Sequence, residues 1–379
     1  MIVVATTAEP GDEPRIALSP ETAKKLKALG CEVRIEKGAG ERSFFLDNAF
    51  ADAGAKVMPS AAEALDGADI VLKVRRPSSE DVEKMKPGAL LAAMLDPYSA
   101  KEGIEALAQA KINAFSMEFM PRITRAQSMD VLSSQSNLAG YKAVVNAAER
   151  FSRAFPMMMT AAGTVPAARV FVMGVGVAGL QAVGTAKRLG AVVTATDVRP
   201  ASKEQVQSLG GKFIAVEDEE FKQAETAGGY AKEMSADYKR KQAELVADHL
   251  KVQDIVITTA LIPGRPAPKL ISKAMVESMK PGSIIVDLAA ERGGNTEVTK
   301  PGESIVHNGV TIMGELNLAG EVAGNASSLY ARNLYAFIEL LIDKKTGAIA
   351  INWDDDIVKG TALTRDGAVI HPSLTGGKS

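Results

Sequence analysis

Two similar series of strand and helix patterns occupy the two halves of the chain, and this repetition limits the fold more than any other feature. The first series contains KLKALGCEVRI (25–35) and MKPGALLAAML (85–95), and the second contains AKRLGAVVTAT (186–196) and MKPGSIIVDLA (279–289). In each series a predicted helix ends at Leu-Gly before a strand, and Lys-Pro-Gly turns into a buried strand. Strands that alternate with helices are typical of parallel sheets. The sequence therefore predicts an α/β protein with two related, doubly wound parallel-sheet domains.

Chain length agrees with two domains, because 379 residues exceed what one hydrophobic core usually serves. We expect the first domain to comprise residues 1–130 and 325–379, and the second to comprise residues 131–324. If the two domains face each other, the space between them is a cleft in which a ligand can bind.

Three segments outside the sheets have recognisable patterns. A helix at 141–155 is expected to connect the domains, with its beginning in the Ser-rich stretch 133–137, and a hairpin at 155–168 follows it. The three consecutive methionines of this hairpin need apolar contact on both faces, in a core or at a subunit interface, and the flexibility of methionine favours the interface. The tail is expected to begin as a helix near Ser327, to form a β-hairpin over about 348–367 and to pack back on the first domain.

Composition excludes several classes of function. The net charge of -2 argues against a nucleic-acid-binding protein, which needs cations to neutralise phosphates. Cys31 is the only cysteine, and the three histidines lie far apart in the sequence, so we expect neither a disulfide nor a metal site. The N-terminus does not read as a signal peptide, and no apolar run approaches the ~20 residues of a membrane span. A cytoplasmic location is expected, with attachment to a membrane partner left open.

A glycine-rich motif opens the second series. Gly174, Gly176 and Gly179 form GxGxxG between a predicted strand and a predicted helix. In this context the first glycine permits a tight turn, the second lets the backbone approach a pyrophosphate, and the third lets the helix pack closely. The pyrophosphate would lie at the helix N-terminus, through backbone contacts that include Val177 and Ala178. The pattern predicts a Rossmann-like dinucleotide-binding domain, and the alternative is a glycine turn that binds nothing.

An acidic residue completes the motif. Asp197 ends the next predicted strand, about 20 residues further on, where it would accept hydrogen bonds from the adenosine ribose. Its charge would repel a 2′-phosphate, which favours NAD(H) over NADP(H). Arg199 complicates this preference, because an arginine there can accommodate that phosphate; we favour a solvated side chain or one stacked on adenine.

Two further loops are candidates for ligand contact. TTALIPGRPAP (258–268) follows a buried strand, at the end where open sheets bind ligands, although a proline-rich turn explains it too. AETAGGYAKEM (224–234) lies in a polar insertion, and its Gly-Gly pair offers a hinge. We interpret residues 220–240 either as a mobile flap, with Tyr230 at its tip, or as a surface loop.

The segment RITRAQSMDVLSSQSNLAG (122–140) is dense in polar side chains and lies at the expected junction of the domains. It can be a solvated linker or the polar wall of a ligand site. If the two domains face each other, the segment lies opposite the glycine-rich turn, and this position favours the site.

The sequence resembles the soluble NAD(H)-binding alpha subunits of proton-translocating NAD(P) transhydrogenases. The segments that carry the resemblance are PRITRAQSMDVLSSQSNLAGYKAV, FPMMMTAAGTVPAARVFVMGVGVAGLQAVGTAKRLGA, TAGGYAKEM, TTALIPGRPAP and TRDGAVIHPSLTG. The resemblance covers essentially the whole chain. It implies that NADH bound here passes hydride to NADP⁺ on a partner subunit, coupled to proton translocation. It also implies a homodimer, a membrane-spanning partner and peripheral association with the inner membrane through the partner subunits.

The resemblance also implies roles for individual residues. The side chains expected to act at the nicotinamide and its ribose are Arg122, Gln127, Asp130 and Ser133. The other residues expected to contact the cofactor are Ile123, Thr124, Arg125, Gly174, Gly176, Val177, Ala178, Gly179, Asp197, Val198, Arg199, Gly229, Tyr230, Gln242, Ala260 and Leu261. Hydride transfer between two nicotinamides needs no protein acid or base, only positioning and exclusion of water, which suits a set without histidine.

Two alternatives remain. EPGDEPRIALSPE also resembles the alanine dehydrogenases, in which positions matching Arg15 and Lys73 serve the substrate. The histidine expected at the end of ALLAAML is absent, however, and Glu291 replaces an expected aspartate, so oxidation of an amino acid lacks its acid/base. Arg15 and Lys73 are then best interpreted as structural. A non-catalytic NAD sensor would keep the glycine motif without needing the whole nicotinamide set.

Overall fold

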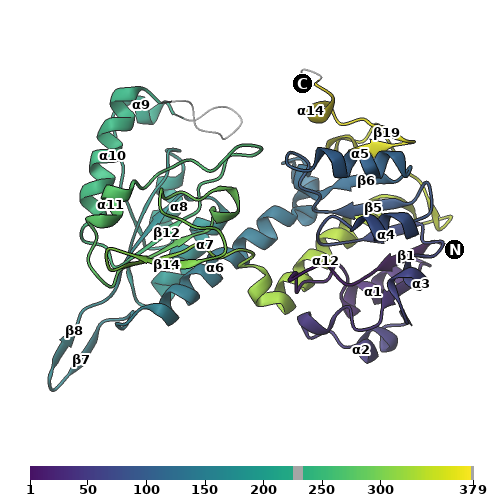
Figure 1. The fold of residues 1–379 in the computed structure, drawn as a ribbon, viewed down its shortest axis with the longest axis horizontal. Helices are drawn as coiled ribbons and strands as arrows, with labels where there is room; N and C mark the ends of the chain where they lie inside the picture. The colour runs from purple at the N-terminus through teal and green to yellow at the C-terminus, as the bar shows by residue number, and fades with distance from the viewer. Residues whose placement is uncertain (225–233, 377–379) are drawn as a thin grey trace. The chain divides into compact units, whose positions relative to one another are not determined.

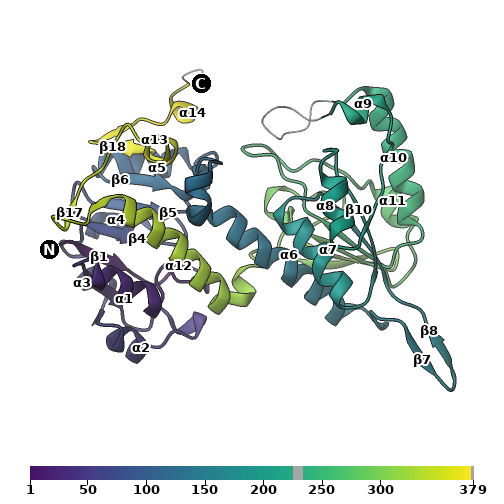
Figure 2. The same cartoon turned by 180° about the vertical axis from the view of Figure 1, so that it is seen from behind.

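The computed structural model describes residues 1–224 and 234–376, and it divides the chain into two compact units. Unit 1 comprises Met1–Gln135 and Ala319–Ser379, and unit 2 comprises Ser136–Leu318. The boundaries expected from the sequence, after residues 130 and 324, lie a few residues away. Figure 1 shows the elements of each unit coloured along the chain, and Figure 2 shows them from behind.

A six-stranded sheet forms the centre of unit 1, in the order β3-β2-β1-β4-β5-β6, and all its strand pairs are parallel. The strands are β1 (Val3–Thr6), β2 (Glu32–Glu36), β3 (Lys56–Met58), β4 (Ile70–Leu72), β5 (Leu90–Ala93) and β6 (Asn113–Ser116). The chain starts in the middle of the sheet and winds outward in both directions. The predicted doubly wound fold is therefore confirmed in this unit.

Successive residues of the unit 1 strands face opposite helix layers. In β4, Ile70 and Leu72 belong to the core shared with α1 and α12, whereas Val71 belongs to the core shared with α3, α4 and α5. Successive side chains thus point to opposite faces of the sheet, and helices bury both faces, as is typical of parallel sheets. The helices are α1 (Pro20–Ala28), α2 (Asp47–Asp52), α3 (Ala61–Leu65), α4 (Ser79–Lys84), α5 (Lys101–Gln109) and α12 (Ala323–Leu340).

The C-terminal tail returns to unit 1, as predicted. Its helix α12 begins at Ala323, shortly before the expected start near Ser327, and lies across one face of the sheet in Figure 2. Tyr330 of α12 is fully buried, and its hydroxyl donates to the carbonyl oxygen of Lys73 at 2.9 Å. The tail therefore completes the core of the first unit.

The β-hairpin predicted over 348–367 is wrong. A helix, α13 (Asp356–Thr361), occupies the middle of this stretch, and two short hairpins flank it. Asp355 caps α13 by accepting a hydrogen bond from the Ile357 N–H at 2.8 Å, and such a cap outweighs the strand-like alternation of the sequence. The small flanking elements are β16 (Ile342–Asp343), β17 (Ala348–Ile349), β18 (Thr364–Arg365), β19 (Ala368–Val369) and α14 (Pro372–Thr375).

A seven-stranded sheet forms the centre of unit 2, in the order β11-β10-β9-β12-β13-β15-β14. All its pairs are parallel except β14–β15 at one edge. The repeated Lys-Pro-Gly turns precede β5 in unit 1 and β13 here, and these strands occupy equivalent places in the two sheets. The strands are β9 (Arg169–Met173), β10 (Val192–Thr196), β11 (Lys212–Phe213), β12 (Ile255–Thr258), β13 (Ile284–Asp287), β14 (Ser304–His307) and β15 (Val310–Met313).

Helices also cover both faces of the unit 2 sheet. Ile255 and Ile257 of β12 pack in the core with α6, α7 and α8, whereas Val256 packs in the core with α10 and α11. The helices are α6 (Val131–Arg150), α7 (Val177–Arg188), α8 (Ser202–Ser208), α9 (Glu219–Lys222), α10 (Ala236–Leu250) and α11 (Lys273–Glu277). Of the loop expected at 220–240, the two ends are thus helical, and residues 225–233 lie outside the described residues.

Two connecting segments, a helix and a hairpin, were expected between the sheets. The connecting helix was expected at 141–155 with its beginning in 133–137, and α6 begins at Val131 and ends at Arg150. The serines and Asn137 of its first turns have low helix propensity, so the clear helical pattern of the sequence begins only after Gly140. The predicted hairpin is present as β7 (Met158–Thr160) and β8 (Gly163–Val165), and Figure 1 shows it extending away from the rest of unit 2.

The methionines of this hairpin are exposed. Met157, Met158 and Met159 are 61%, 44% and 80% exposed, so a core position within the single chain is excluded. No helix among the described residues combines the length and the apolar character that crossing a bilayer requires.

Candidate functional site

The glycine-rich turn joins β9 to α7 at the carboxyl end of β9, an inner strand of the unit 2 sheet. Gly174 has a φ of +94°, a conformation that other residues rarely adopt. A Cβ at Gly179 would lie 1.9 Å from the Gly174 carbonyl oxygen, so only glycine lets α7 begin this close to the strand. A Cβ at Gly176, in contrast, would meet no atom within 4 Å among the described residues. The backbone at Gly176 is thus open to a ligand, and this openness fits the approach of a pyrophosphate.

The first turn of α7 also contacts α6 closely. A Cβ at Gly140 would lie 2.1 Å from the carbonyl oxygen of Ala178. Gly140 is therefore a fourth glycine on which the shape of the turn depends, and it lies outside the GxGxxG motif. Val177, next to Ala178, is 39% exposed at the helix N-terminus, where backbone N–H groups favour an anion.

Asp197 follows β10 and is bonded to the glycine-rich turn. Its Oδ2 accepts the Val175 N–H at 2.7 Å, and its Oδ1 accepts the backbone N–H and Nε of Arg199, both at 2.9 Å. Nη2 of Arg199 donates to the Val175 carbonyl at 3.0 Å. The Arg199 guanidinium is thus paired with Asp197 and 30% of its side-chain surface stays exposed, so stacking on adenine remains a prediction. Val198, between them, is 49% exposed.

The loop 258–268 is bonded to the same turn. Oγ1 of Thr259 donates to the Gly174 carbonyl at 2.9 Å. Asn295, fully buried, holds the next residue from both sides: its Oδ1 accepts the Ala260 N–H at 3.0 Å, and its Nδ2 donates to the Ala260 carbonyl at 2.8 Å. Leu261 is 54% exposed beside them. The loop therefore presents an apolar side chain from a backbone that Asn295 fixes.

Three other candidates from unit 2 have different outcomes. Gln242 of α10 accepts the Val216 N–H at 2.9 Å and donates to Oγ1 of Thr196 at 3.1 Å, so it joins the ends of two strand regions beside Asp197. Gly229 and Tyr230 lie outside the described residues.

The segment proposed for the nicotinamide side forms a 3-10 helix, η3 (Thr124–Met129), in unit 1. Ala126 and Met129 are buried in the core, one turn apart, and they turn the other side chains outward. The exposed candidates on this segment are Arg122, Ile123, Thr124, Arg125 and Gln127. A polar surface supported by two apolar anchors is what a binding segment needs and what an unstructured linker lacks.

Asp130 and Ser133 form the junction between η3 and α6. The Asp130 carboxylate accepts the Ser133 N–H at 2.9 Å and the Ser133 hydroxyl at 2.5 Å, as an N-cap residue does. The structure thus brings these two candidates together, with Gln127 one turn before them. Their helix-capping contact explains both residue types without a ligand, and it also fixes both groups in place.

Two contacts attach this segment to the C-terminal tail. Arg125 forms a two-point ion pair with Asp355, with both N–O distances at 2.7 Å. Asn333 of α12 donates from Nδ2 to the Ser128 carbonyl at 2.7 Å and accepts the Ser134 hydroxyl at 2.7 Å. The partner of Arg125 is therefore a protein carboxylate.

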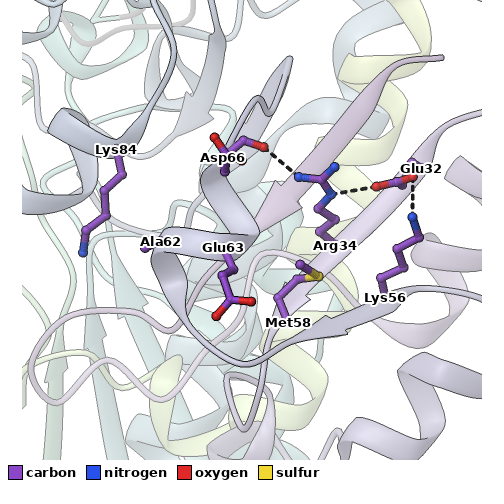
Figure 3. Close-up of a pocket in the computed structure, with 8 residues that line it drawn as sticks. All are labelled: Glu32, Arg34, Lys56, Met58, Ala62, Glu63, Asp66 and Lys84. Carbon is purple, nitrogen blue, oxygen red and sulfur yellow. Dashed lines mark hydrogen bonds and ion pairs between the residues drawn. The ribbon is translucent and has the colours of Figure 1, made fainter.

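Two surface hollows are unrelated to these residues. The first, of about 650 Å³, lies in unit 1 and is shown in Figure 3; Glu32 binds both Arg34 and Lys56 there. Three cationic and three carboxylate side chains line it, so it favours neither kind of ion. The second, of about 280 Å³, lies at the amino ends of β9 and β12, where Arg153 is paired with Asp254 at 2.6 Å. Ligands of open α/β sheets bind at the opposite, carboxyl ends of the strands.

Arg15 and Lys73 lie in a buried ionic cluster of unit 1. Glu13 binds the Arg15 guanidinium at two points, both at 2.7 Å, and Gln135 accepts from it at 2.9 Å. Lys73 donates to Thr7 and to the Ala8 carbonyl, at 2.9 and 2.6 Å. Burial raises the pKa of Glu13, but the hydrogen bonds and charges of Arg15 and Arg75 outweigh it and bring that pKa to about 2. Both cations are thus satisfied within the protein.

These features define a dinucleotide-binding protein of two doubly wound units, with one glycine-rich turn. Models of the N-terminal and C-terminal domains of alanine dehydrogenase/PNT match residues 6–139 and 143–372. Over 99% of both chains, the sequence is 56% identical to an NAD(P) transhydrogenase alpha-subunit chain of Rhodospirillum rubrum. The chain therefore belongs to the alanine dehydrogenase/PNT family and, within it, to the NAD(P) transhydrogenase alpha subunits.

Solved structures agree with this placement. A crystal structure of transhydrogenase from Sinorhizobium meliloti is 55% identical, covers 98% of this chain and 100% of that one, and has a TM-score of 0.89. An L-alanine dehydrogenase structure is 25% identical, covers 99% and 98% of the two chains, and has a TM-score of 0.81. The predicted resemblance, enzyme class and NAD(H) cofactor are thereby confirmed.

Sequence reasoning missed the residues that hold the candidate site in place. These residues, Gly140, Asn295 and Asn333, are not expected to touch the cofactor. Each contacts the backbone of a segment whose own residues are predicted to bind it. Gly140 precedes the helix predicted at 141–155 and lies inside α6 only in the folded chain, so the sequence pattern did not mark it as a packing position.

Proposed function

We propose that this chain is the NAD(H)-binding subunit of a proton-translocating transhydrogenase and that it passes hydride from NADH to NADP⁺ held by a partner subunit. The observation that carries the proposal is an intact glycine-rich turn with Asp197, in a chain that matches transhydrogenase alpha subunits over 99% of its length. Proton translocation and the NADP(H) site are assigned to partner subunits, through which this chain would be attached peripherally to the inner membrane.

The adenosine end of NAD(H) is assigned to unit 2. The open backbone at Gly176 and the N-terminus of α7, at Val177 and Ala178, would bind the pyrophosphate. Asp197 would accept from the ribose hydroxyls, and its charge would oppose a 2′-phosphate. The other residues assigned to this end are Gly174, Gly179, Val198, Arg199, Gly229, Tyr230, Gln242, Ala260 and Leu261.

The nicotinamide end is assigned to the segment that begins at Arg122. Gln127, Asp130 and Ser133 would orient the ring and its ribose by hydrogen bonds, with backbone contacts from Ile123 and Thr124. We leave the guanidinium of Arg125 out of this set, because it is bound to Asp355.

The chemistry asks little of the protein beyond position. NADH supplies the hydride directly to the second nicotinamide, so no side chain has to accept or donate a proton. The residues of the segment bind, orient and exclude water, which can account for a large part of a rate enhancement. A set that contains Arg, Gln, Asp and Ser is sufficient for that role.

A homodimer is part of the proposal. An isolated two-stranded hairpin is marginally stable in water, and β7–β8 exposes three methionines. A second copy of the chain would cover them.

The test is hydride transfer between purified components. The chain is mixed with the NADP(H)-binding partner, and NADH oxidation is followed with an NADP⁺ analogue whose reduced form absorbs separately. We expect transfer that depends on both proteins. Gly176→Ala should fold, because the added methyl meets no protein atom, but should weaken NADH binding by about tenfold or more.

Gly184→Ala in α7 is the matched control, because its nearest contact would be at 4.0 Å and it lies away from the turn. It should bind NADH as the parental chain does. Absence of transfer in the mixture, or equal NADH affinity for Gly176→Ala, would contradict the proposal.

Alanine dehydrogenase activity is the second candidate, supported by the structural likeness to that enzyme. The buried cluster argues against it, because Arg15 and Lys73 are already bound by Glu13, Gln135, Thr7 and Ala8. Pyruvate and ammonia offered as acceptors with NADH test it directly. We expect no oxidation of NADH beyond that of a control without protein.

A further inference from the structure

One buried amide holds both ends of the stretch that carries the proposed nicotinamide contacts. Asn333 of α12 is 8% exposed, and its Nδ2 donates to the Ser128 carbonyl at 2.7 Å. Its Oδ1 accepts the Ser134 hydroxyl, also at 2.7 Å. Ser128 follows Gln127 in η3, and Ser134 follows Ser133 in the first turn of α6. The two hydrogen bonds therefore enclose Asp130 and lie next to Gln127 and Ser133.

The other supports of this stretch restrain it less. Ala126 and Met129 are buried in the core, but apolar contacts are not directional. The ion pair between Arg125 and Asp355 lies at the surface, where Arg125 is 49% exposed, and exposed pairs restrain little. The amide of Asn333 is different, because a buried hydrogen-bonding group has to keep its partners. Gln135 of α6 also makes buried hydrogen bonds, with Arg15 and the Ala326 carbonyl, but these fix α6 alone. Asn333 bonds to both η3 and α6, so among these supports it has the strongest control over their relative orientation.

We propose that Asn333 is a positioning residue for hydride transfer: it sets the geometry of Gln127, Asp130 and Ser133 without touching the nicotinamide. This inference rests on the proposed function. Transfer between two rings requires close alignment, and a misplacement of about 1 Å by a distant mutation can cost about 100-fold in rate. Binding tolerates such a shift better, because the adenosine end of NADH is assigned to unit 2, whereas both hydrogen bonds of Asn333 lie within unit 1.

The experiment separates rate from affinity. Asn333→Ala removes both hydrogen bonds, whereas Asn333→Asp keeps the acceptor for Ser134 and sets a negative charge against the Ser128 carbonyl. For each variant, the NADH dissociation constant is measured by titration, and the hydride-transfer rate is measured at saturating NADH with the NADP(H)-binding partner present. We expect the rate to fall by about tenfold or more in both, with the dissociation constant changed by no more than about threefold.

Asn113→Ala is the matched control. Asn113 is 9% exposed in the same unit, donates to the Gly88 carbonyl and accepts the Asp366 N–H, so its loss also removes two hydrogen bonds of a buried amide. It should lower the unfolding temperature like Asn333→Ala but leave the transfer rate of the folded protein unchanged. If Asn333→Ala fails to fold, Ser134→Ala is the substitute. It removes only the hydrogen bond from the partly buried Ser134 hydroxyl to Asn333, and it should slow transfer by a smaller factor.

The outcomes are distinguishable. A folded Asn333→Ala or Ser134→Ala variant that transfers hydride at the parental rate overturns the positioning role and leaves the proposed function intact. Equal losses of hydride-transfer rate in Asn113→Ala and Asn333→Ala also overturn it, because they would mark a general effect of weakened packing. A parental chain that neither binds NADH nor transfers hydride removes the proposed function and this inference together.

Discussion

Asp197 illustrates how one side chain can serve a fold and a ligand together. The sequence places it correctly at the end of a strand, but its hydrogen bonds to Val175 and Arg199 depend on the folded turn and do not follow from spacing. The same holds for Gly176: the motif predicts glycine there, and the open space around it supports a ligand as the reason. At this scale residue types are predictable, whereas their partners are not.

The Asp197–Arg199 pair leads to a prediction about cofactor choice. Asp197→Ala removes an acceptor for the ribose and releases the Arg199 guanidinium, which is then able to meet a 2′-phosphate. We expect the affinity for NADH to fall by roughly tenfold, since charge-assisted hydrogen bonds contribute about 1.5–3 kcal/mol, and the affinity for NADPH to rise. Titration of both nucleotides checks this.

The double variant Asp197→Ala/Arg199→Ala is the control. It should bind NADH as weakly as Asp197→Ala does, but its affinity for NADPH should not rise. Unchanged affinity of Asp197→Ala for both nucleotides would remove this residue from the ribose site.

The ionic cluster around Glu13 predicts a pH dependence of stability. The pKa of Glu13 in the folded state is about 2, below its ordinary value of 4.5. A lowered carboxyl pKa stabilises the fold above about pH 4.5, and this contribution is lost as the pH falls toward 2. Glu13→Gln should therefore destabilise the chain by about 3 kcal/mol at neutral pH, as the loss of one partner in a buried pair does. Chemical unfolding from pH 7 to pH 3 should show this difference shrinking.

Glu9 contributes with the opposite sign. Burial raises its pKa despite the nearby Lys73, so its ionisation lowers stability as the pH rises. It is present in both chains, and only the repulsion from Glu13, the smallest of the causes of that shift, differs between them. A difference between the parental chain and Glu13→Gln that stays constant from pH 7 to pH 3 would show that the Glu13 charge is not responsible.

At the scale of elements, buried strands were predictable, whereas the exact starts of α6 and α13 were not. Strands such as β4 and β13 are continuous apolar runs between turn residues, and this pattern depends only on local sequence. The starts of α6 and α13 depend on Asp130 and Asp355, which cap helices whose first turns look polar or strand-like. Single caps of this kind decide a boundary without changing the periodicity on which prediction rests.

Asp355 both caps α13 and pairs with Arg125 of η3. Comparing two variants separates the contributions of the cap and the ion pair to stability. Asp355→Ala loses the α13 cap and the pair with Arg125, whereas Arg125→Ala loses the pair alone. We expect a loss of about 1 kcal/mol for the first and less for the second, because caps contribute about 1 kcal/mol and exposed pairs between about 0 and 1. Urea unfolding measures both.

NADH titration of the same two variants tests the role of Arg125. If its side chain only braces η3, Arg125→Ala and Asp355→Ala should alter NADH affinity equally and slightly. A large loss confined to Arg125→Ala would return this residue to the set of cofactor contacts.

At the scale of the whole molecule, repetition in the sequence predicted two sheets with the same winding. Apart from β14, unit 2 repeats the order 3-2-1-4-5-6 of unit 1, and the antiparallel β14 adds an edge strand beyond β15. The return of α12 to unit 1 rests on contacts between residues far apart in the chain, such as Tyr330 and Lys73. Local patterns predict the pieces of such a fold and leave their long-range pairing open, except where, as here, a repeat supplies it.

The hairpin β7–β8 leads to the prediction that belongs to the whole assembly. Met157 and Met159 are two residues apart on an extended chain, so they share one face, and both are exposed in the single chain. If a second copy covers this face, Met157→Lys/Met159→Lys places two charges in the interface. We expect the parental chain to be a dimer and the variant a monomer in light scattering, with no loss in monomer stability.

Val306→Lys is the matched control for that variant. Val306 is a 72% exposed apolar residue on β14, in the same unit but on another hairpin. Its substitution adds the same kind of charge without touching β7–β8 and should leave the dimer intact. A dimer that survives both methionine substitutions would place the interface elsewhere on the surface, and dissociation by Val306→Lys would place it at the edge of the unit 2 sheet. The exposed methionines argue against both of these outcomes, because an uncovered hairpin of this kind gains stability only from a partner.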